Sequence, residues 1–190
     1  MESKKSENFQ VGTANVKRAT LEAIGLFYAR WAIFERNSCQ NYCQEDMLSK
    51  LAKLFVNEKI EITKLDEMFK FGEKFRHAIC EYLEKEGPLD ENVIQNRMHS
   101  KGIHSNQMHN PKIELVDFFL QRKQDKLAYL TGLLYAINRI RNNFLHGLTD
   151  EDHFDEKIDI YIYGSEILAL LSRSIFHKYD FDTIKTSPEL

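Results

Sequence analysis

The sequence predicts an all-α fold, an up-and-down helical bundle of about five to six helices. Apolar residues recur at three- and four-residue spacing along most of the chain, which is the pattern of amphipathic helices. Three prolines and eight glycines are too few for the turns of a many-stranded sheet. A content of 43% hydrophobic and 29% charged residues is typical of a globular domain with a real core.

The chain of 190 residues predicts one helical domain over residues 13–180, with flexible ends at 1–12 and 181–190. The polar start and the absence of eighteen consecutive apolar residues predict a cytoplasmic protein with no membrane partner. The net charge of −3 means that any binding of nucleic acid must come from a local group of basic residues.

The first predicted helix runs from Thr13 to about Ser38 and places Trp31 in the core. A short second helix carries Leu48, Leu51 and Phe55, and a third continues from about residue 65 until "GP" at 87–88 stops it. Within the third helix, Gly72 indicates a close contact or a bend.

Residues 88–111 lose the helical periodicity, apart from one turn around residues 93–94, and predict a long polar loop. His99, His104 and His109 recur every fifth residue there. A metal cluster is one interpretation, but no Cys or carboxylate joins them at a known ligand spacing. A solvated or RNA-facing loop is favoured.

Helical periodicity resumes from Ile113 to His146, with an interruption considered near "QRKQDK" at 121–126, and a last helix is predicted over 155–178. The acidic residues at 150–156 could hold a cation. They also precede that helix, where carboxylates stabilise the positive end of the helix dipole, and this structural role is favoured.

Cys39, Cys43 and Cys80 are odd in number and sparse, which favours reduced thiols over a disulfide framework. A zinc site that adds His77 is an alternative, but the paired CxxC spacing of structural zinc sites is absent. Buried or half-buried thiols are the expectation.

The segment "RIRNNFLHGL" at 139–148 ends the apolar helix with arginine, asparagine and histidine. Tyr135, Arg139, Asn142 and His146 fall on one polar face, whereas Arg141 projects about 140° away from His146 on an ideal helix. Arg141 therefore reaches His146 only if the last turn unwinds, or if His146 belongs to a second chain. The opposite, core-facing seam is formed by Leu130, Leu133, Leu134, Ile137, Ile140 and Phe144.

The plain interpretation of these polar residues is a solvated helix end. However, "RNNFLHG" also resembles the signature of HEPN domains (higher eukaryotes and prokaryotes nucleotide-binding): Arg141, Asn142, His146 and Gly147, late in a helical bundle. The resemblance covers seven residues as sequence and most of the chain as architecture.

The resemblance implies a metal-independent endoribonuclease, without a cofactor, whose active site forms from two motifs across a homodimer interface. His146 would transfer protons, since the ordinary pKa of a histidine side chain lies near neutrality. Arg141 would hold the scissile phosphate and Asn142 would orient the imidazole or bind phosphate. RNA would be cleaved by 2′-OH attack to 2′,3′-cyclic phosphate ends. Arg139 is a second-choice phosphate contact, and Tyr135 and Asn143 are further substrate contacts.

Enzymes of this kind often act as toxins or in antiviral defence, so an antitoxin or regulatory protein is an expected partner. The alternative is a non-catalytic dimeric HEPN bundle that binds nucleotide, RNA or protein. A third interpretation is a helical partner-binding protein in which "RNNFLHG" occurs by chance.

Overall fold

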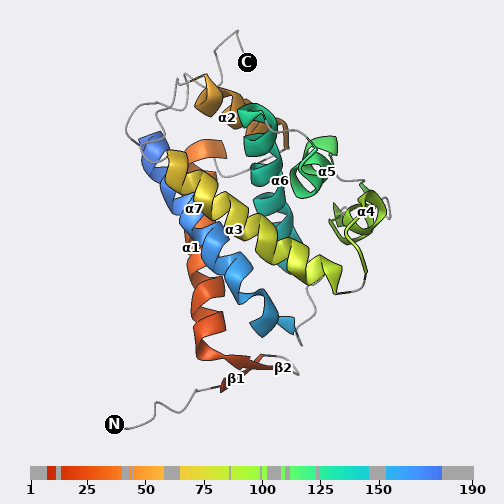
Figure 1. Ribbon diagram of the computed structural model, residues 1–190. Coiled ribbons are helices and arrows are strands. Elements are labelled where there is room, and N and C mark those ends of the chain that lie inside the picture. Colours follow the sequence, from red (N-terminus) through yellow and green to blue (C-terminus); the bar gives the residue numbers. More distant parts are fainter. Residues whose placement is uncertain are drawn as a thin grey trace.

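The structure is a computed structural model that describes residues 8–11, 14–39, 43, 45–57, 65–85, 87–98, 100–101, 108–109, 112–122, 125–145 and 153–176. Its elements, in chain order, are β1 (Asn8–Val11), β2 (Ala14–Lys17), α1 (Arg18–Cys39), α2 (Glu45–Val56), α3 (Leu65–Glu84), α4 (Glu91–Met98), β3 (Ser100–Lys101), β4 (Met108–His109), α5 (Ile113–Leu120), α6 (Lys126–Leu145), a 3₁₀ turn (Asp155–Lys157) and α7 (Ile158–Phe176) (Figure 1). The described residues are mostly helical, which confirms the all-α prediction.

Helices α1, α7 and α3 pack side by side (Figure 1). The first two run in the same direction, because Thr20 near the start of α1 bonds Asp155 just before α7, and Arg30 further along α1 bonds Ser165. Gly164 of α7 sits where this group is tightest, since an added Cβ would lie 2.8 Å from the ring of Phe27. The apolar faces of these three helices thus pack together in a dense core that contains aromatic rings.

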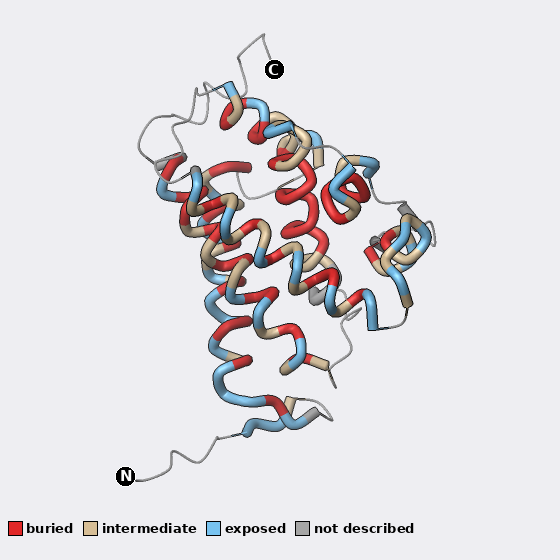
Figure 2. Tube along the Cα trace, in the orientation of Figure 1, coloured by how far each residue is buried: buried red, intermediate tan, exposed pale blue. Residues whose placement is uncertain are grey.

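Helices α2 and α5 cover α6, so α6 is buried on nearly all sides from Leu130 to Arg139 (Figure 2). The predicted close contact at Gly72 is confirmed, because an added Cβ would collide with the hydroxyl group of Tyr129 on α6. Helix α6 is therefore held by contacts with several helices, and not only through an apolar stripe along one of its faces.

Local signals set several helix ends. Asp90 accepts a hydrogen bond from the amide of Val93 at the start of α4, and Asp125 accepts one from the amide of Ala128 at the start of α6, both at 2.8 Å. Gln121, with φ of 52°, ends α5 in the left-handed region. The interruption considered at 121–126 therefore separates two helices.

Two segments differ from their predictions. The first helix begins at Arg18, not Thr13, because residues 14–17 pair with Asn8–Val11 in a short antiparallel hairpin. The predicted long loop contains α4, whose Ile94 and Met98 are buried in the core, and the small β3–β4 hairpin. Extra short helices explain why more helices are described than the five to six expected.

None of the described helices is long and apolar enough to cross a bilayer.

Candidate functional site

The motif segment lies at the C-terminal end of α6 (Figure 1). Tyr135, Arg139, Arg141 and Asn142 are described with their side chains, whereas the side chain of Asn143 is not. His146 and Gly147, the last two motif positions, lie outside the described residues. The site is accordingly built from the arginine end of the motif.

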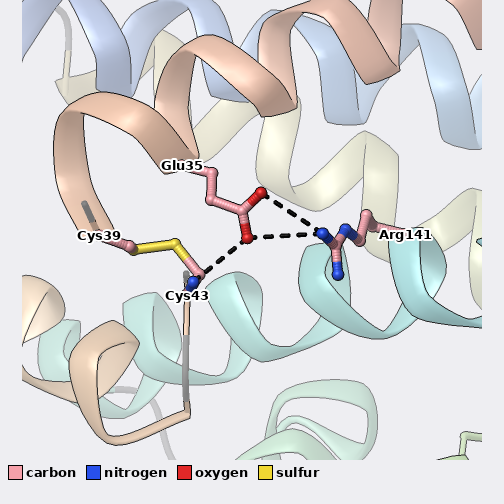
Figure 3. Close-up of a disulfide and its surroundings, with 4 residues drawn as sticks. All are labelled: Glu35, Cys39, Cys43 and Arg141. Carbon is pink, nitrogen blue, oxygen red and sulfur yellow. Dashed lines mark hydrogen bonds and ion pairs between the residues drawn. A yellow bond between two sulfur atoms is a disulfide. The ribbon is translucent and has the colours of Figure 1, made fainter. Parts of the chain in front are cut away.

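Arg141 is held from three sides. Its Nη1 donates a 2.7 Å hydrogen bond to Oδ1 of Asn142, and its Nη2 lies 3.4 and 3.5 Å from the two carboxylate oxygens of Glu35 on α1 (Figure 3). Its guanidinium carbon lies 5.5 Å from the centre of the Trp31 ring, close enough for a cation–π interaction. These contacts fix the direction of the guanidinium group.

The Arg141 side chain is 25% exposed and that of Glu35 is 14% exposed. Charge-assisted hydrogen bonds are typically about 2.7–2.9 Å long, so the contact with Glu35 is a loose one. Glu35 therefore orients the N–H donors of the Arg141 guanidinium group but does not bind them tightly. A phosphate oxygen can compete with Glu35 for these donors.

Tyr28 ties the backbone of the motif to α1. Its hydroxyl group donates a 3.1 Å hydrogen bond to the backbone carbonyl of Arg141. Burial raises the pKa of the Tyr28 phenol, the neighbouring Tyr161 adds to this, and the charge of Arg141 opposes it. A neutral phenol therefore joins the last turns of α6 to α1.

Cys39 and Cys43 form a disulfide, which corrects the prediction of reduced thiols and removes both sulfurs from the zinc site considered with His77 (Figure 3). Helix α1 ends at Cys39, so the four-residue spacing does not continue along a helix face. The backbone amide of Cys43 then donates a 3.2 Å hydrogen bond to Glu35. The disulfide thus holds the donor that orients the carboxylate beside Arg141.

Cys80 is free and buried, and burial raises the pKa of its thiol to about 11. Nothing within the described ranges brings three His, Cys, Asp or Glu side chains together as metal ligands. His99 and His104 lie outside the described residues, as does the side chain of His109.

The helical periodicity predicted that Arg139 and Tyr135 lie on a solvated face. Both side chains are buried instead. Arg139 is only 4% exposed and donates a 2.8 Å hydrogen bond to Glu45, the first residue of α2. Burial lowers the pKa of the Arg139 guanidinium and Glu45 opposes that shift. Tyr135 is buried as well, and burial together with the charge of Glu114 raises its pKa to about 12. These two polar side chains therefore face α2 and not water.

Residues 150–152 of the acidic segment lie outside the described residues, and Asp155 and Glu156 bond groups outside α7, a structural role other than the dipole role that was favoured. Asp155 accepts hydrogen bonds from the backbone amide of Lys17 and the hydroxyl group of Thr20, and so joins the start of α1 to the turn before α7. Glu156 pairs with Lys85 at 2.6 Å. These two carboxylates are partnered by the protein itself.

Sequence reasoning missed Glu35 and Trp31 as parts of the site. They are four residues apart and share one face of α1 with Tyr28, an aromatic and acidic group at the edge of a core stripe. That spacing was the available signal. Trp31 is 3% exposed, and its ring Nε1 is buried without a hydrogen-bond acceptor among the described residues.

Comparison with known proteins gives no match for this chain among protein families, curated proteins or solved structures.

Proposed function

We propose that this protein is a metal-independent endoribonuclease of the toxin or antiviral-defence type, acting as a homodimer. RNA is the substrate, and attack of the ribose 2′-OH on the adjacent phosphate gives 2′,3′-cyclic phosphate and 5′-hydroxyl ends. A cytoplasmic location and an antitoxin or regulatory partner belong to the same proposal, which draws on the resemblance to HEPN domains.

One observation carries the proposal: Arg141 presents a partly exposed guanidinium group at the end of α6, oriented by Asn142, Glu35 and Trp31. A fixed fork of donors matches the oxygens of a phosphodiester and the extra charge of its transition state. The buried Arg139 offers no such access, since its side chain is 5% exposed. The geometry therefore favours Arg141 as the phosphate ligand.

In the proposed reaction, His146 removes the proton from the 2′-OH or donates one to the departing 5′-oxygen. Asn142 has its carbonyl oxygen on Arg141, so we assign it to orienting that guanidinium group. This replaces orientation of the imidazole as its first role.

Glu35 favours a second candidate, a non-catalytic dimeric bundle that binds nucleotide, RNA or protein. A carboxylate beside Arg141 partly neutralises the charge that phosphate binding needs. In that case Arg141 and Glu35 form a structural ion pair between α6 and α1.

Labelled single-stranded RNA, incubated with the protein in EDTA, separates the two functions. We expect cleavage by the wild type and its loss in His146→Ala, with cyclic phosphate ends identified on the products. Arg122→Ala is the matched control, because Arg122 is an exposed arginine that pairs with Glu91 on another face. RNA binding without cleavage in both wild type and His146→Ala supports the binding module.

A further inference from the structure

The disulfide between Cys39 and Cys43 lies beside Arg141 and is connected to it through one carboxylate (Figure 3). The backbone amide of Cys43 donates a 3.2 Å hydrogen bond to Oε1 of Glu35. The same oxygen lies 3.5 Å from Nη2 of Arg141. A change in the position of Cys43 therefore reaches Arg141 through a single side chain.

Two links hold Cys43 in place. The disulfide joins it to Cys39, the last residue of α1. On its other side, Glu45 begins α2 and donates its carboxylate oxygen to a 2.8 Å hydrogen bond from Arg139 of α6. Reduction of the disulfide removes the first link and leaves the second, so its effect is confined to the surroundings of Cys43.

The disulfide closes too short a loop to be a main support of the fold. Cys39 and Cys43 are four residues apart. A cross-link stabilises a protein largely by restricting the unfolded chain, and this effect grows with the length of the loop that it closes. Helix α1 is also packed on α7, and α2 on α6. We therefore expect the reduced protein to remain folded.

We propose that Cys39 and Cys43 form a redox switch for the site at Arg141, which binds RNA more tightly in the disulfide form than in the dithiol form. This inference rests on the proposed function, which supplies the phosphate that Arg141 binds. It also agrees with the proposed cytoplasmic location, because disulfides in the reducing cytosol are usually transient, catalytic or redox-sensing.

The direction of the switch follows from the donors that surround Glu35. Its side chain is 14% exposed, and a carboxylate with so little access to water needs hydrogen-bond donors from the protein. In the disulfide form the Cys43 amide is one of these donors, and the contact with Arg141 is loose. When reduction releases the amide, Arg141 is the donor that remains among the described residues, and the ion pair tightens. A phosphate then competes less well for Arg141.

A dithiol reductant drives the switch by thiol–disulfide exchange. Cys43 is half-buried, whereas Cys39 is 4% exposed, so a thiolate of the reductant attacks Sγ of Cys43. Sγ of Cys39 leaves and takes up the proton that the attacking thiol lost. The second thiol of the reductant then attacks the reductant sulfur of the mixed disulfide and releases Cys43 as a thiol. Two electrons pass to the protein, and the reductant becomes a disulfide.

The third cysteine does not take part in this exchange. Cys80 is buried, and burial raises the pKa of its thiol to about 11. Exchange requires a thiolate that is accessible to the other sulfur. Cys80→Ala is therefore a matched control for the loss of a cysteine.

The coupling between the disulfide and Arg141 can be measured without RNA, because two linked equilibria change each other by the same factor. The protein is equilibrated with mixtures of reduced and oxidised dithiothreitol, and the dithiol fraction is measured by alkylation and mass spectrometry. Arg141→Met removes the partner that stabilises the dithiol form. We expect it to shift the equilibrium about two- to fivefold towards the disulfide. Arg122→Met, at an exposed pair with Glu91, is the matched control and should cause no shift.

Binding of labelled single-stranded RNA by the oxidised and the reduced protein tests the switch itself. His146→Ala is the background for these measurements, so that the probe is not cleaved. We expect reduction to raise the RNA dissociation constant about two- to fivefold. Cys39→Ala combined with Cys43→Ala should bind RNA like the reduced protein under both conditions, and Cys80→Ala should keep the response.

Glu35→Gln distinguishes the proposed route from any other effect of reduction. A neutral amide cannot form an ion pair with Arg141, so RNA binding by this variant should no longer depend on the disulfide. A full redox response in Glu35→Gln overturns the proposal. An unchanged disulfide equilibrium in Arg141→Met also overturns it, as does a disulfide that dithiothreitol does not reduce in the folded protein.

Circular dichroism of the reduced protein completes the test. Loss of helix on reduction would mean that the disulfide supports the fold, and would overturn the switch. Failure of the proposed function gives a different result. If neither form binds RNA while Arg141→Met still shifts the disulfide equilibrium, the RNA-binding function is wrong and the redox coupling at Arg141 is supported.

Discussion

Arg139 and Arg141 lie two residues apart on α6, yet carboxylates of different helices bind them: Glu45 of α2 holds Arg139, and Glu35 of α1 holds Arg141. Two steps along a helix turn the side chain by about 200°. The Arg139 side chain is 5% exposed and that of Arg141 is 25% exposed. The first arginine therefore joins helices, whereas the second remains accessible to a ligand.

We expect the Arg139–Glu45 pair to contribute to stability asymmetrically. Glu45→Ala leaves a buried guanidinium group without its partner and should cost roughly 3–5 kcal/mol of unfolding free energy. Arg139→Met removes the buried charge and keeps much of the volume, while Glu45 remains 30% exposed and can be hydrated. Its cost should be under about 1.5 kcal/mol.

Urea unfolding followed by circular dichroism measures both changes. Glu91→Ala is a control for loss of a carboxylate from an arginine pair, because the Arg122–Glu91 pair is exposed on both sides and should matter little. Equal losses in Glu45→Ala and Glu91→Ala would contradict the buried role of Arg139.

Two glycines in helices should respond in opposite ways to alanine. At Gly132 an added Cβ would collide with Phe118 and lie 2.6 Å from the backbone oxygen of Glu114, so Gly132→Ala should cost roughly 1–3 kcal/mol. At Gly25 it meets nothing, and Gly25→Ala should add about 0.5–1 kcal/mol by helix propensity. Thermal unfolding of both variants tests this, and stabilisation by Gly132→Ala would show that α5 and α6 are further apart.

The apolar periodicity of the sequence correctly predicted helices whose buried residues recur at helical spacing. Trp31 was placed in the core and is 3% exposed, and the short helix carrying Leu48, Leu51 and Phe55 is α2. Helix α4 was not predicted beyond one turn. It has only two core residues, and its packing against α5 is tertiary.

Of the candidate site, only the residues on α6 could be predicted from the sequence. Arg141 and Glu35 are separated by 106 residues, and no pattern in either segment indicates that they meet. Arg139 was assigned to a solvated face because the helical periodicity of apolar residues cannot show that α2 covers this side chain. The disulfide was missed because Cys39 and Cys43 have the spacing of one helix face, whereas α1 ends at Cys39.

Unfolding should become easier in alkali. Burial raises the pKa of Tyr161 above the ordinary tyrosine value of 10.0 and that of Tyr135 to about 12. Above pH 10 the unfolded chain loses these protons while the folded protein keeps them. Stability is therefore complete below about pH 10 and falls as pH rises, by about 1.4 kcal/mol per pH unit for each such tyrosine.

Urea unfolding at several pH values between about 9 and 11 measures this slope. Tyr161→Phe has no proton to lose and should flatten it by the share of one group. An unchanged slope in Tyr161→Phe would mean that the phenol ionises as easily in the folded protein as in the unfolded chain.

Glu35→Gln should strengthen RNA binding. It removes the negative charge beside Arg141, and a carboxylate at this distance offsets phosphate attraction by up to about 1 kcal/mol, or roughly fivefold in affinity. Glu73→Gln is the matched control, because Glu73 pairs with Arg76 on α3. If both variants change the RNA dissociation constant equally, the effect is one of net charge and Arg141 is not the phosphate ligand.

The proposed roles of Arg141 and His146 separate binding from catalysis. His146→Ala should remove proton transfer, typically worth roughly 100- to 10,000-fold in rate, and leave RNA affinity nearly intact because phosphate binding is assigned to Arg141. Arg141→Ala should weaken both, and should reduce the salt dependence of binding by about one unit of slope for each phosphate that the guanidinium group neutralises. Arg141→Lys should recover charge but not the two-pronged geometry.

Single-turnover cleavage and salt-dependent binding on the same RNA measure these effects. Arg139→Met controls for the stability of α6, since it alters the neighbouring arginine without changing the accessible one. Cleavage abolished in Arg139→Met while that variant stays folded, with Arg141→Ala fully active, would reverse the assignment. Because the Arg139 side chain is 5% exposed, RNA could then reach it only if α2 moved away from α6, and protection of the α2 backbone amides from hydrogen exchange would fall when RNA binds.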